Sequence, residues 1–440
     1  MTAVAEVTDT EAAPAALTEE YENVPVPQSA RRSLASVSAV WIGFPMILTC
    51  AVFGGLVVYS LGFWKGMLAI ALGNAALMAY VGSLSYLAGK TGKNFALTAM
   101  ETFGKKGYVI PSGFLATIVI GWFAFQTGLT GAILADTMQW SERWTTFAAG
   151  IGYVAITLLG IRALSVIGVI AAPLFIVLGA TAIVLALRDS SLSDAVNYSG
   201  GAGLTAMSMG AAVTLVIACF IDSGTMTSDF TRWSRNGKQG FLAAFSAFPI
   251  ANGIALFVGG LIVALGAATN PGTNGGNFLG TLIDQGGLLV PLAVVFVFVN
   301  LGSVCAHCLY NGAVGWGQLS GNKMRPLTLV LGAVGVALAV AGIWSHFEQW
   351  LNLLGVIVPP IGIVIILDQL VLPRFWGSTR PEASLRWPPF AAWAVGSAAA
   401  LTSHEYAPWL SDALVGMIVG AVAFVGFSYV IRTRTMEVVK

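Results

Sequence analysis

Twelve apolar segments constrain the fold of this chain more than any other feature, because each is long enough to cross a lipid bilayer. A transmembrane helix needs about 20 apolar residues to span a hydrocarbon core about 30 Å thick. The segments cover residues 34–60, 66–88, 109–138, 144–161, 163–187, 206–230, 240–268, 287–317, 326–345, 350–372, 387–403 and 409–431. Charged residues make up only 9% of the 440 residues, against about 25% in a soluble domain. The sequence therefore predicts an all-α integral membrane protein with twelve transmembrane helices.

The Lys and Arg residues between these segments predict their direction across the membrane. With the N-terminus inside, 18 of the 21 Lys and Arg residues fall on the cytoplasmic side, whereas Lys65, Arg143 and Arg188 fall on the other. Cytoplasmic loops of membrane proteins carry such an excess of positive charge. We therefore expect a multi-pass protein of the plasma (inner) membrane of the cell, with both termini in the cytoplasm.

The segments outside the spans exclude several classes of protein. Residues 1–30 contain six acidic residues and no Lys or Arg, so residues 1–33 are expected to form a disordered cytoplasmic tail, not a signal peptide. Loops reach only about 20 residues, and no Walker-type phosphate loop is present. We expect no nucleic-acid partner and no ATP-driven pump, which leaves a secondary transporter or a channel. The four cysteines lie in apolar segments and are expected to be free thiols.

Two of the twelve segments contain helix breaks near mid-depth. In "WIGFPMILTC", Gly43 and Pro45 lie about 11 residues into the first span, and the stretch 222–225, "DSGT", lies about 15 Å from Arg232 in the sixth. Breaks at corresponding places in oppositely oriented halves indicate an inverted repeat. We expect five spans at 34–187, five at 206–372, two more at 387–431 and a tail at 432–440. Two harmless kinks are the alternative, because Gly and Pro are common in membrane helices.

Polar side chains within the spans point to a pathway through the protein. Trp122 and Gln126 are four residues apart and share one helix face, which suits a flat heterocycle that stacks and hydrogen-bonds. A second polar stripe at helical spacing lies in the eighth span and comprises Asn300, Ser303, His307 and Asn311. Packing and hydrogen bonds between helices are the alternatives for both sets. A lone residue such as His307 is more often a neutral core histidine than a ligand or proton carrier.

Asp222 is a carboxylate at the expected bilayer midplane. Such a residue costs a few kcal/mol on insertion scales, so its default interpretation is functional. It could accept hydrogen bonds from an amino or ring N–H edge of a substrate. The alternative is a structural cap on the half-helix that begins at Ser223, where the helix N-terminus favours a negative charge.

Four motifs in order give the chain a resemblance to a known family. They are "PVPQSAR" (Pro25–Arg31), "AGKTG" (Ala88–Gly92), "IGWF" (Ile120–Phe123) and "GTMTSDFTRWSRN" (Gly224–Asn236). With them the chain resembles the nucleobase:cation symporter-1 (purine-cytosine permease) family and, within it, the cytosine permease branch. The resemblance implies a LeuT-like core of ten helices in inverted repeats plus two C-terminal helices, working by alternating access.

The same resemblance implies which side chains contact the substrate. Trp122 and Phe220 match positions that sandwich a planar base. Gln126 matches an amide of the hydantoin branch, while the glutamine of the cytosine branch falls at Val119 and is absent. That branch also has a small hydroxyl residue where this chain has Asp222. The full set of expected substrate contacts is Trp122, Gln126, Cys219, Phe220, Asp222, Asn300 and Cys305.

A sodium site is also implied by the family, with a departure in this chain. Its ligands match the carbonyls of Gly43 and Met46 and the side chains of Asn300 and Ser303. Val304 stands where a further hydroxyl ligand is expected. Sodium prefers oxygen ligands, so the coupling ion is left open between Na⁺ and H⁺, and no cofactor is expected.

We therefore expect a cation-coupled importer of a nucleobase or related nitrogen heterocycle, with a cytosine-like aminopyrimidine favoured. A channel, or a membrane-embedded enzyme that uses Asp222 and His307 as acid and base, is the alternative from another class. The paired breaks favour the transporter. An amino-acid or polyamine carrier of the same architecture is a further alternative, although such substrates need no stacking faces. The oligomeric state is not determined by the sequence.

Overall fold

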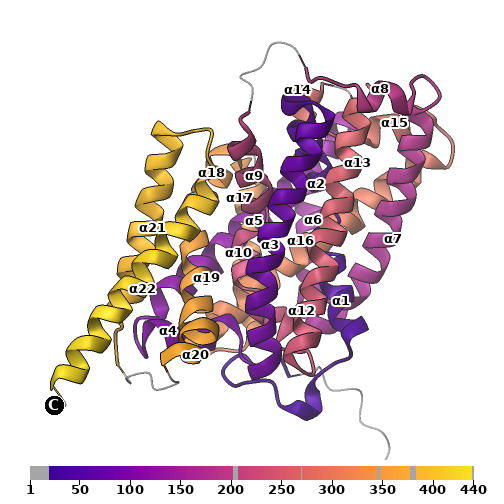
Figure 1. Cartoon of the computed structure of the whole chain (residues 1–440). Coiled ribbons are helices and arrows are strands. Elements are labelled where there is room, and N and C mark those ends of the chain that lie inside the picture. Colours follow the sequence, from indigo (N-terminus) through magenta and orange to yellow (C-terminus); the bar gives the residue numbers. More distant parts are fainter. Residues whose placement is uncertain (1–18, 202–206, 269, 344–346, 377–382, 439–440) are drawn as a thin grey trace, which may run out of the picture.

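Long helices that run roughly side by side make up the computed structural model of this chain (Figure 1). The structure describes residues 19–201, 207–268, 270–343, 347–376 and 383–438. Within these ranges the only β pairing is an isolated bridge between Arg32 and Ser234. Residues 1–18 of the expected tail lie outside the described residues.

The first half of the chain forms the helices η1 (Gln28–Ala30), α1 (Leu34–Ile42), α2 (Leu48–Leu61), α3 (Phe63–Thr91), α4 (Phe95–Phe103), α5 (Val109–Met138), α6 (Glu142–Leu158), α7 (Ile161–Ala186), α8 (Leu192–Val196), α9 (Met209–Ala218) and α10 (Ile221–Thr225). The second half forms α11 (Ser228–Thr231), α12 (Gly237–Phe245), η2 (Ser246–Ala251), α13 (Asn252–Ala264), α14 (Pro271–Asn274), α15 (Leu279–Ile283), α16 (Leu289–Ser320), α17 (Met324–Val340), α18 (Phe347–Ile357), α19 (Pro359–Ile366), η4 (Leu367–Val371), α20 (Leu372–Trp376), α21 (Trp387–Tyr406) and α22 (Asp412–Val438). Seven described helical stretches are long and apolar enough to cross a membrane, and α2, α9 and α17 are shorter apolar helices. The count of twelve spans and the repeat boundaries stay predictions.

The helices divide into a main body and a pair at one side. α21 and α22 pack against each other and contact the body most extensively through α19, with further contacts to α18, α9 and α4 (Figure 1, yellow and orange). In the body, α5 packs along α16 and α2 packs along α13. The second contact depends on glycine, because a Cβ atom on Gly54 or Gly259 would collide with the backbone of the facing helix. Small residues allow such close approach between membrane helices, and here they hold α2 against its neighbour.

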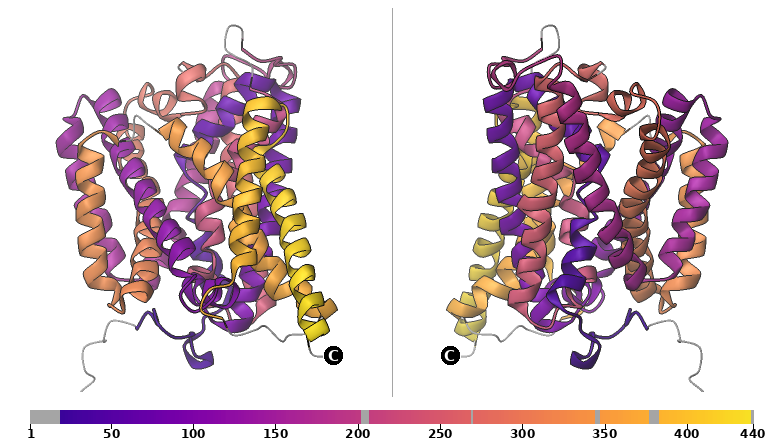
Figure 2. Two further views of the ribbon diagram at one scale, coloured as in Figure 1. Left: turned by 90° about the vertical axis from the view of Figure 1, so that its left-hand side faces the viewer. Right: turned by 90° about the vertical axis from the view of Figure 1, so that its right-hand side faces the viewer.

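Residues 19–33, the N-terminal segment, correct one expectation. They pass beneath the end of the bundle that carries α4 and α20, which we call the lower end (Figures 1 and 2). The prediction of a disordered tail is wrong for this part, because Glu20 and Glu22 are buried, with only 2% and 3% of their surface exposed. Composition alone predicted solvation, but fixed hydrogen-bond partners in the folded protein compensate for the burial of these groups.

Those partners come from several helices that are distant in the sequence. The Glu20 carboxylate accepts hydrogen bonds from the Tyr310 hydroxyl at 2.8 Å and the Ile161 amide at 3.2 Å. The Glu22 carboxylate accepts one from the Met324 amide, at the start of α17, at 2.7 Å. Arg232 donates to the backbone carbonyls of Glu20 at 2.7 Å and Tyr21 at 2.8 Å. The N-terminal segment therefore ties α7, α16 and α17 to the chain that follows α11.

Candidate functional site

The first break separates α1 from α2, and side chains of α16 satisfy the backbone groups that it frees. The Asn300 amide donates to the Met46 carbonyl at 2.8 Å, and its oxygen accepts from the Leu48 amide at 2.8 Å. The Ser303 hydroxyl donates to the Gly43 carbonyl at 2.7 Å. A membrane helix tolerates irregular backbone only where such partners exist or where it lines a cavity. The four residues matched to a sodium site are thus brought together by these contacts.

His307 continues this junction one turn further along α16. Its two ring nitrogens lie 2.6 Å from the Ser303 carbonyl and 2.8 Å from the Val40 carbonyl. Its ring stacks on Phe44, with centroids 5.0 Å apart and planes at 14°. The predicted stripe of Asn300, Ser303, His307 and Asn311 is fully buried. The stripe faces the protein interior, and its first three members support the α1–α2 break.

The second break lies between α9, which ends at Ala218, and α10, which begins at Ile221. Asp222 is fully buried, and its Oδ1 accepts a hydrogen bond from the Ser223 amide at 2.7 Å. The Trp122 indole and the Ser223 side chain also interact with this carboxylate. Asp222 is the second residue of α10, whose N-cap is Phe220. A capping side chain precedes the helix and accepts from its second or third amide, so the bond from the adjacent Ser223 amide is a local contact within α10.

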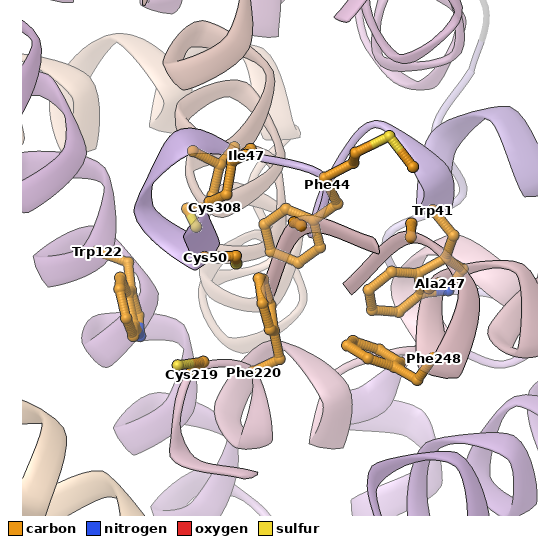
Figure 3. Close-up of a cluster of buried hydrophobic side chains, with 14 of the residues drawn as sticks. Trp41, Phe44, Ile47, Cys50, Trp122, Cys219, Phe220, Ala247, Phe248 and Cys308 are labelled. Carbon is orange, nitrogen blue, oxygen red and sulfur yellow. The ribbon is translucent and has the colours of Figure 1, made fainter. Parts of the chain in front are cut away.

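A small cavity lies between the two breaks (Figure 3). In the picture the rings of Trp122 and Phe220 stand on either side of a space, with Cys219 below it and Cys50 and Cys308 above. The lining residues are Phe44, Ile47, Thr49, Cys50, Phe53, Trp122, Gln126, Cys219, Phe220, Ser223, Val304 and Cys308. The free volume is about 10 Å³, on the scale of one water molecule. A planar base therefore needs the lining side chains to move apart before it enters.

Gln126 is the amide of this cavity. It is fully buried on α5, and its Oε1 accepts a hydrogen bond from the Thr49 hydroxyl at 2.7 Å. Its Nε2 has no hydrogen-bond partner among the described residues. An unpaired buried donor costs about 1–3 kcal/mol, so this group is a candidate for a hydrogen bond to a ligand.

The structure brings some of the expected substrate contacts together and leaves others outside the lining. Trp122, Gln126, Cys219 and Phe220 border the cavity, whereas Asp222, Asn300 and Cys305 are not among its lining residues in this conformation. Cys305 faces α5, with its Sγ 3.5 Å from the Thr127 hydroxyl. Contact of Asp222, Asn300 and Cys305 with the substrate stays a prediction.

Sequence reasoning missed several lining residues. They are Phe44, Ile47, Thr49, Cys50, Phe53, Ser223 and Cys308, and Val304, which was considered only for the sodium site. Thr49, Cys50 and Phe53 lie at helical spacing directly after the first break, so the face of α2 that follows the break was the available signal. Ser223 and Cys308 gave no such signal.

An all-helical membrane protein with two discontinuous helices around a buried aromatic and polar cavity is a transport protein in its architecture. Residues 25–431 match the family described as permease for cytosine/purines, uracil, thiamine, allantoin. The chain is 30% identical over 382 residues to the cytosine permease of Escherichia coli K12, covering 86% of this chain and 88% of that protein. It is 24% identical over 366 residues to the hydantoin permease of Microbacterium maritypicum, covering 78% and 74%.

Among solved structures the fold is similar to Mhp1, a nucleobase-cation-symport-1 family transporter in a closed conformation with bromovinylhydantoin bound. The TM-score is 0.77 at 20% sequence identity, covering 94% of this chain and 96% of Mhp1. This chain belongs to the family of permeases for cytosine/purines, uracil, thiamine and allantoin, and is a multi-pass membrane protein. The predicted family and the all-α, LeuT-like fold class are confirmed. The relatives are permeases and transporters rather than enzymes.

Proposed function

We propose that this chain imports a cytosine-like aminopyrimidine, or a closely related nitrogen heterocycle, by cation symport with alternating access. The observation that carries the proposal is the cavity between the two breaks. Trp122 and Phe220 supply flat faces for a planar ring, and the Nε2 of Gln126 supplies an unpaired donor at its edge. The cytosine permease at 30% identity supports the same substrate class.

The remaining expected contacts complete the proposed site once the cavity has opened. Asp222 would accept a hydrogen bond from an amino or ring N–H group, which favours aminopyrimidines over uracil. Cys219 would border the ring, and Asn300 and Cys305 would approach it from α16. The small volume of the cavity supports alternating access, because binding then requires a rearrangement rather than entry into an open pore.

Radiolabelled cytosine counterflow in proteoliposomes tests the proposal. Protein-containing vesicles preloaded with unlabelled cytosine should accumulate labelled cytosine transiently, because a carrier exchanges substrate across the membrane whereas a channel does not. Vesicles preloaded with an amino acid or a polyamine, and supplied with the same compound in labelled form, serve as the control for the alternative carriers. Accumulation in these vesicles and not in the cytosine-loaded ones would refute a heterocycle carrier.

For the coupling ion we propose sodium, bound weakly. The Gly43 and Met46 carbonyls and the Ser303 hydroxyl meet at the α1–α16 junction and offer oxygen ligands to a hard cation. Val304 supplies no oxygen, so the site has one ligand fewer than the family pattern. Proton coupling is the alternative, and uptake with sodium replaced by choline, first at fixed pH and then across pH, separates the two.

The lower end of the bundle is proposed to face the cytoplasm of the cell, across the plasma membrane. The excess of Lys and Arg in the loops of that side supports this direction. With this direction across the membrane, both termini lie in the cytoplasm. The accessibility of introduced cysteines to an impermeant reagent in intact cells tests the proposed direction.

A further inference from the structure

Thr49 is one of the helical threonines whose hydroxyl bonds to a side chain distant in the sequence, as Thr102 and Thr214 also do. Other helical threonines, such as Thr130 and Thr157, donate their hydroxyls to the carbonyl four residues earlier. Thr49 is the second residue of α2, directly after the break. The carbonyl four residues before it belongs to Pro45 and accepts from the Ile47 amide at 2.9 Å. Its hydroxyl instead donates across the cavity wall to Gln126 on α5 at 2.7 Å.

This bond fixes which half of the Gln126 amide faces a ligand. An amide side chain presents an acceptor oxygen and a donor NH₂ group, and rotation by half a turn exchanges them. With Oε1 held by Thr49, the NH₂ group is the half without a partner among the described residues. If the amide turned, its NH₂ group would donate to the Thr49 oxygen, and the single hydrogen of that hydroxyl would lose Oε1 as its acceptor. Thr49 is itself 3% exposed and borders the same cavity, so no bulk water competes for its hydroxyl.

We propose that Thr49 is a positioning residue that determines specificity, by holding Gln126 as a hydrogen-bond donor toward the substrate. The pocket then selects heterocycles that present a carbonyl oxygen or an unprotonated ring nitrogen at this edge. A ring with N–H at that place meets a second donor and is rejected, because both groups are left unpaired. This inference rests on the proposed function and specifies the substrate edge that the site recognises.

Acceptor-deletion analogues test it on the purified full-length protein. Binding is measured for cytosine, for 4-aminopyrimidine, which lacks the exocyclic oxygen, and for 3-deazacytosine, which lacks the ring acceptor N3. In the wild type, the analogue that lacks the acceptor paired with Gln126 should bind about tenfold more weakly than cytosine. In Thr49→Val, which keeps the shape and removes the hydroxyl, this ratio should fall to about twofold, because the amide is free to turn.

Three variants separate positioning from a structural effect. Thr49→Ser keeps the hydroxyl and should keep the tenfold ratio. Thr130→Val is the matched control, since the Thr130 hydroxyl bonds to the backbone carbonyl of Gln126 at 2.9 Å and not to its amide side chain, so the ratio should not change. Gln126→Leu should lower the ratio as Thr49→Val does, and the double variant should lower it no further.

The outcomes distinguish this inference from the proposed function. If the wild type binds none of the three ligands, the proposed function fails. If it binds cytosine but neither deletion weakens binding, or if Thr49→Val weakens all three ligands equally, Thr49 does not set the donor and the inference fails. Should Thr49→Val not fold, Thr49→Ala takes its place, because it also removes the hydroxyl, and an unchanged tenfold ratio in that variant would overturn the inference.

Discussion

The lower end of the bundle and the central cavity both bury polar groups, but they use them differently. At the lower end three buried charged residues are partnered: Glu20, Glu22 and Arg232 each bond to backbone or hydroxyl groups of other elements. The side chains that line the cavity include aromatic rings, thiols and neutral polar groups, and the Nε2 donor of Gln126 has no partner among the described residues. Fully satisfied networks stabilise one arrangement of the chain, whereas an unsatisfied donor is stabilised when a ligand pairs with it.

The comparison predicts that lower-end variants lower stability and that cavity variants lower substrate affinity. The largest effect is expected for Arg232→Ala. Removing this buried guanidinium leaves the Glu20 and Tyr21 carbonyls without donors, and each should cost about 1–3 kcal/mol in the free energy of unfolding. Thermal melting of the purified protein measures the loss, with Arg235→Ala as control because the Arg235 side chain is exposed. An unchanged melting temperature with weakened cytosine binding would reverse the assignment.

Trp122→Ala comes next, on the cavity side of the comparison. Stacking of a base on an aromatic ring is worth about 1–3 kcal/mol, which corresponds to a loss of about 5- to 150-fold in cytosine affinity. Trp144→Ala is the control, since Trp144 is 74% exposed and is not among the residues that line the cavity. Unchanged affinity in a well-folded Trp122→Ala protein would remove this ring from the site.

Asp222→Asn sharpens the comparison, because Asp222 has features of both regions. It is a buried acidic residue with a hydrogen-bond partner, like those of the lower end, and it is also a proposed substrate contact. The substitution keeps the shape and an acceptor oxygen, so the bond from the Ser223 amide should survive, whereas recognition of an amino group loses the charge. We expect cytosine affinity to fall by tenfold or more, about 1.4 kcal/mol, with the melting temperature nearly unchanged. Binding titrations across pH measure the affinity. Equal affinity and pH dependence in the two proteins would leave Asp222 with a structural role only.

Ser303→Ala should have a smaller effect that depends on the ion. A neutral hydrogen bond contributes about 0.5–1.5 kcal/mol, so the protein should fold while its uptake loses most of the remaining sodium stimulation. Uptake in sodium and in choline buffers measures this. Strict, saturable sodium dependence in the wild type that is lost in Ser303→Ala would show that Val304 weakens the site little.

The smallest effect is expected for Glu20→Gln at the lower end. Burial raises the pKa of the Glu20 carboxyl above its ordinary value of 4.5, against the opposing effect of the Tyr310 hydroxyl and Arg232. The folded protein therefore binds this proton more tightly than the unfolded chain. This contribution to stability is complete below pH 4.5 and is lost as the pH rises through the raised pKa.

Melting temperatures from acidic to neutral pH measure this effect. Glu20→Gln stays neutral throughout and should flatten the decrease seen in the wild type. Cytosine affinity should not change, because Glu20 is not among the residues that line the cavity. A wild-type melting temperature that rises over this interval would contradict the expected sign.

Part of the site could be predicted from the sequence because it depends on local pattern. Helical spacing grouped Asn300, Ser303 and His307 on one buried face, and motif matches indicated Trp122 and Phe220 at the cavity. Ser223 and Cys308 could not be found, since neither carries a spacing or composition signal. The N-terminal segment was wrongly expected to be solvated, because its partners on α7, α16 and α17 are distant in the sequence.

The sequence by itself determined that this chain is a helical membrane protein of the nucleobase permease family, since hydropathy, loop charge and family motifs are properties of the chain alone. Only the tertiary structure decided that Glu20 is buried beside Tyr310, and that Thr49 bonds to Gln126 across the cavity wall. Hydrogen bonds of this kind join residues far apart in the chain. They exist only after the helices have packed, because the packing brings donor and acceptor within about 3 Å of each other.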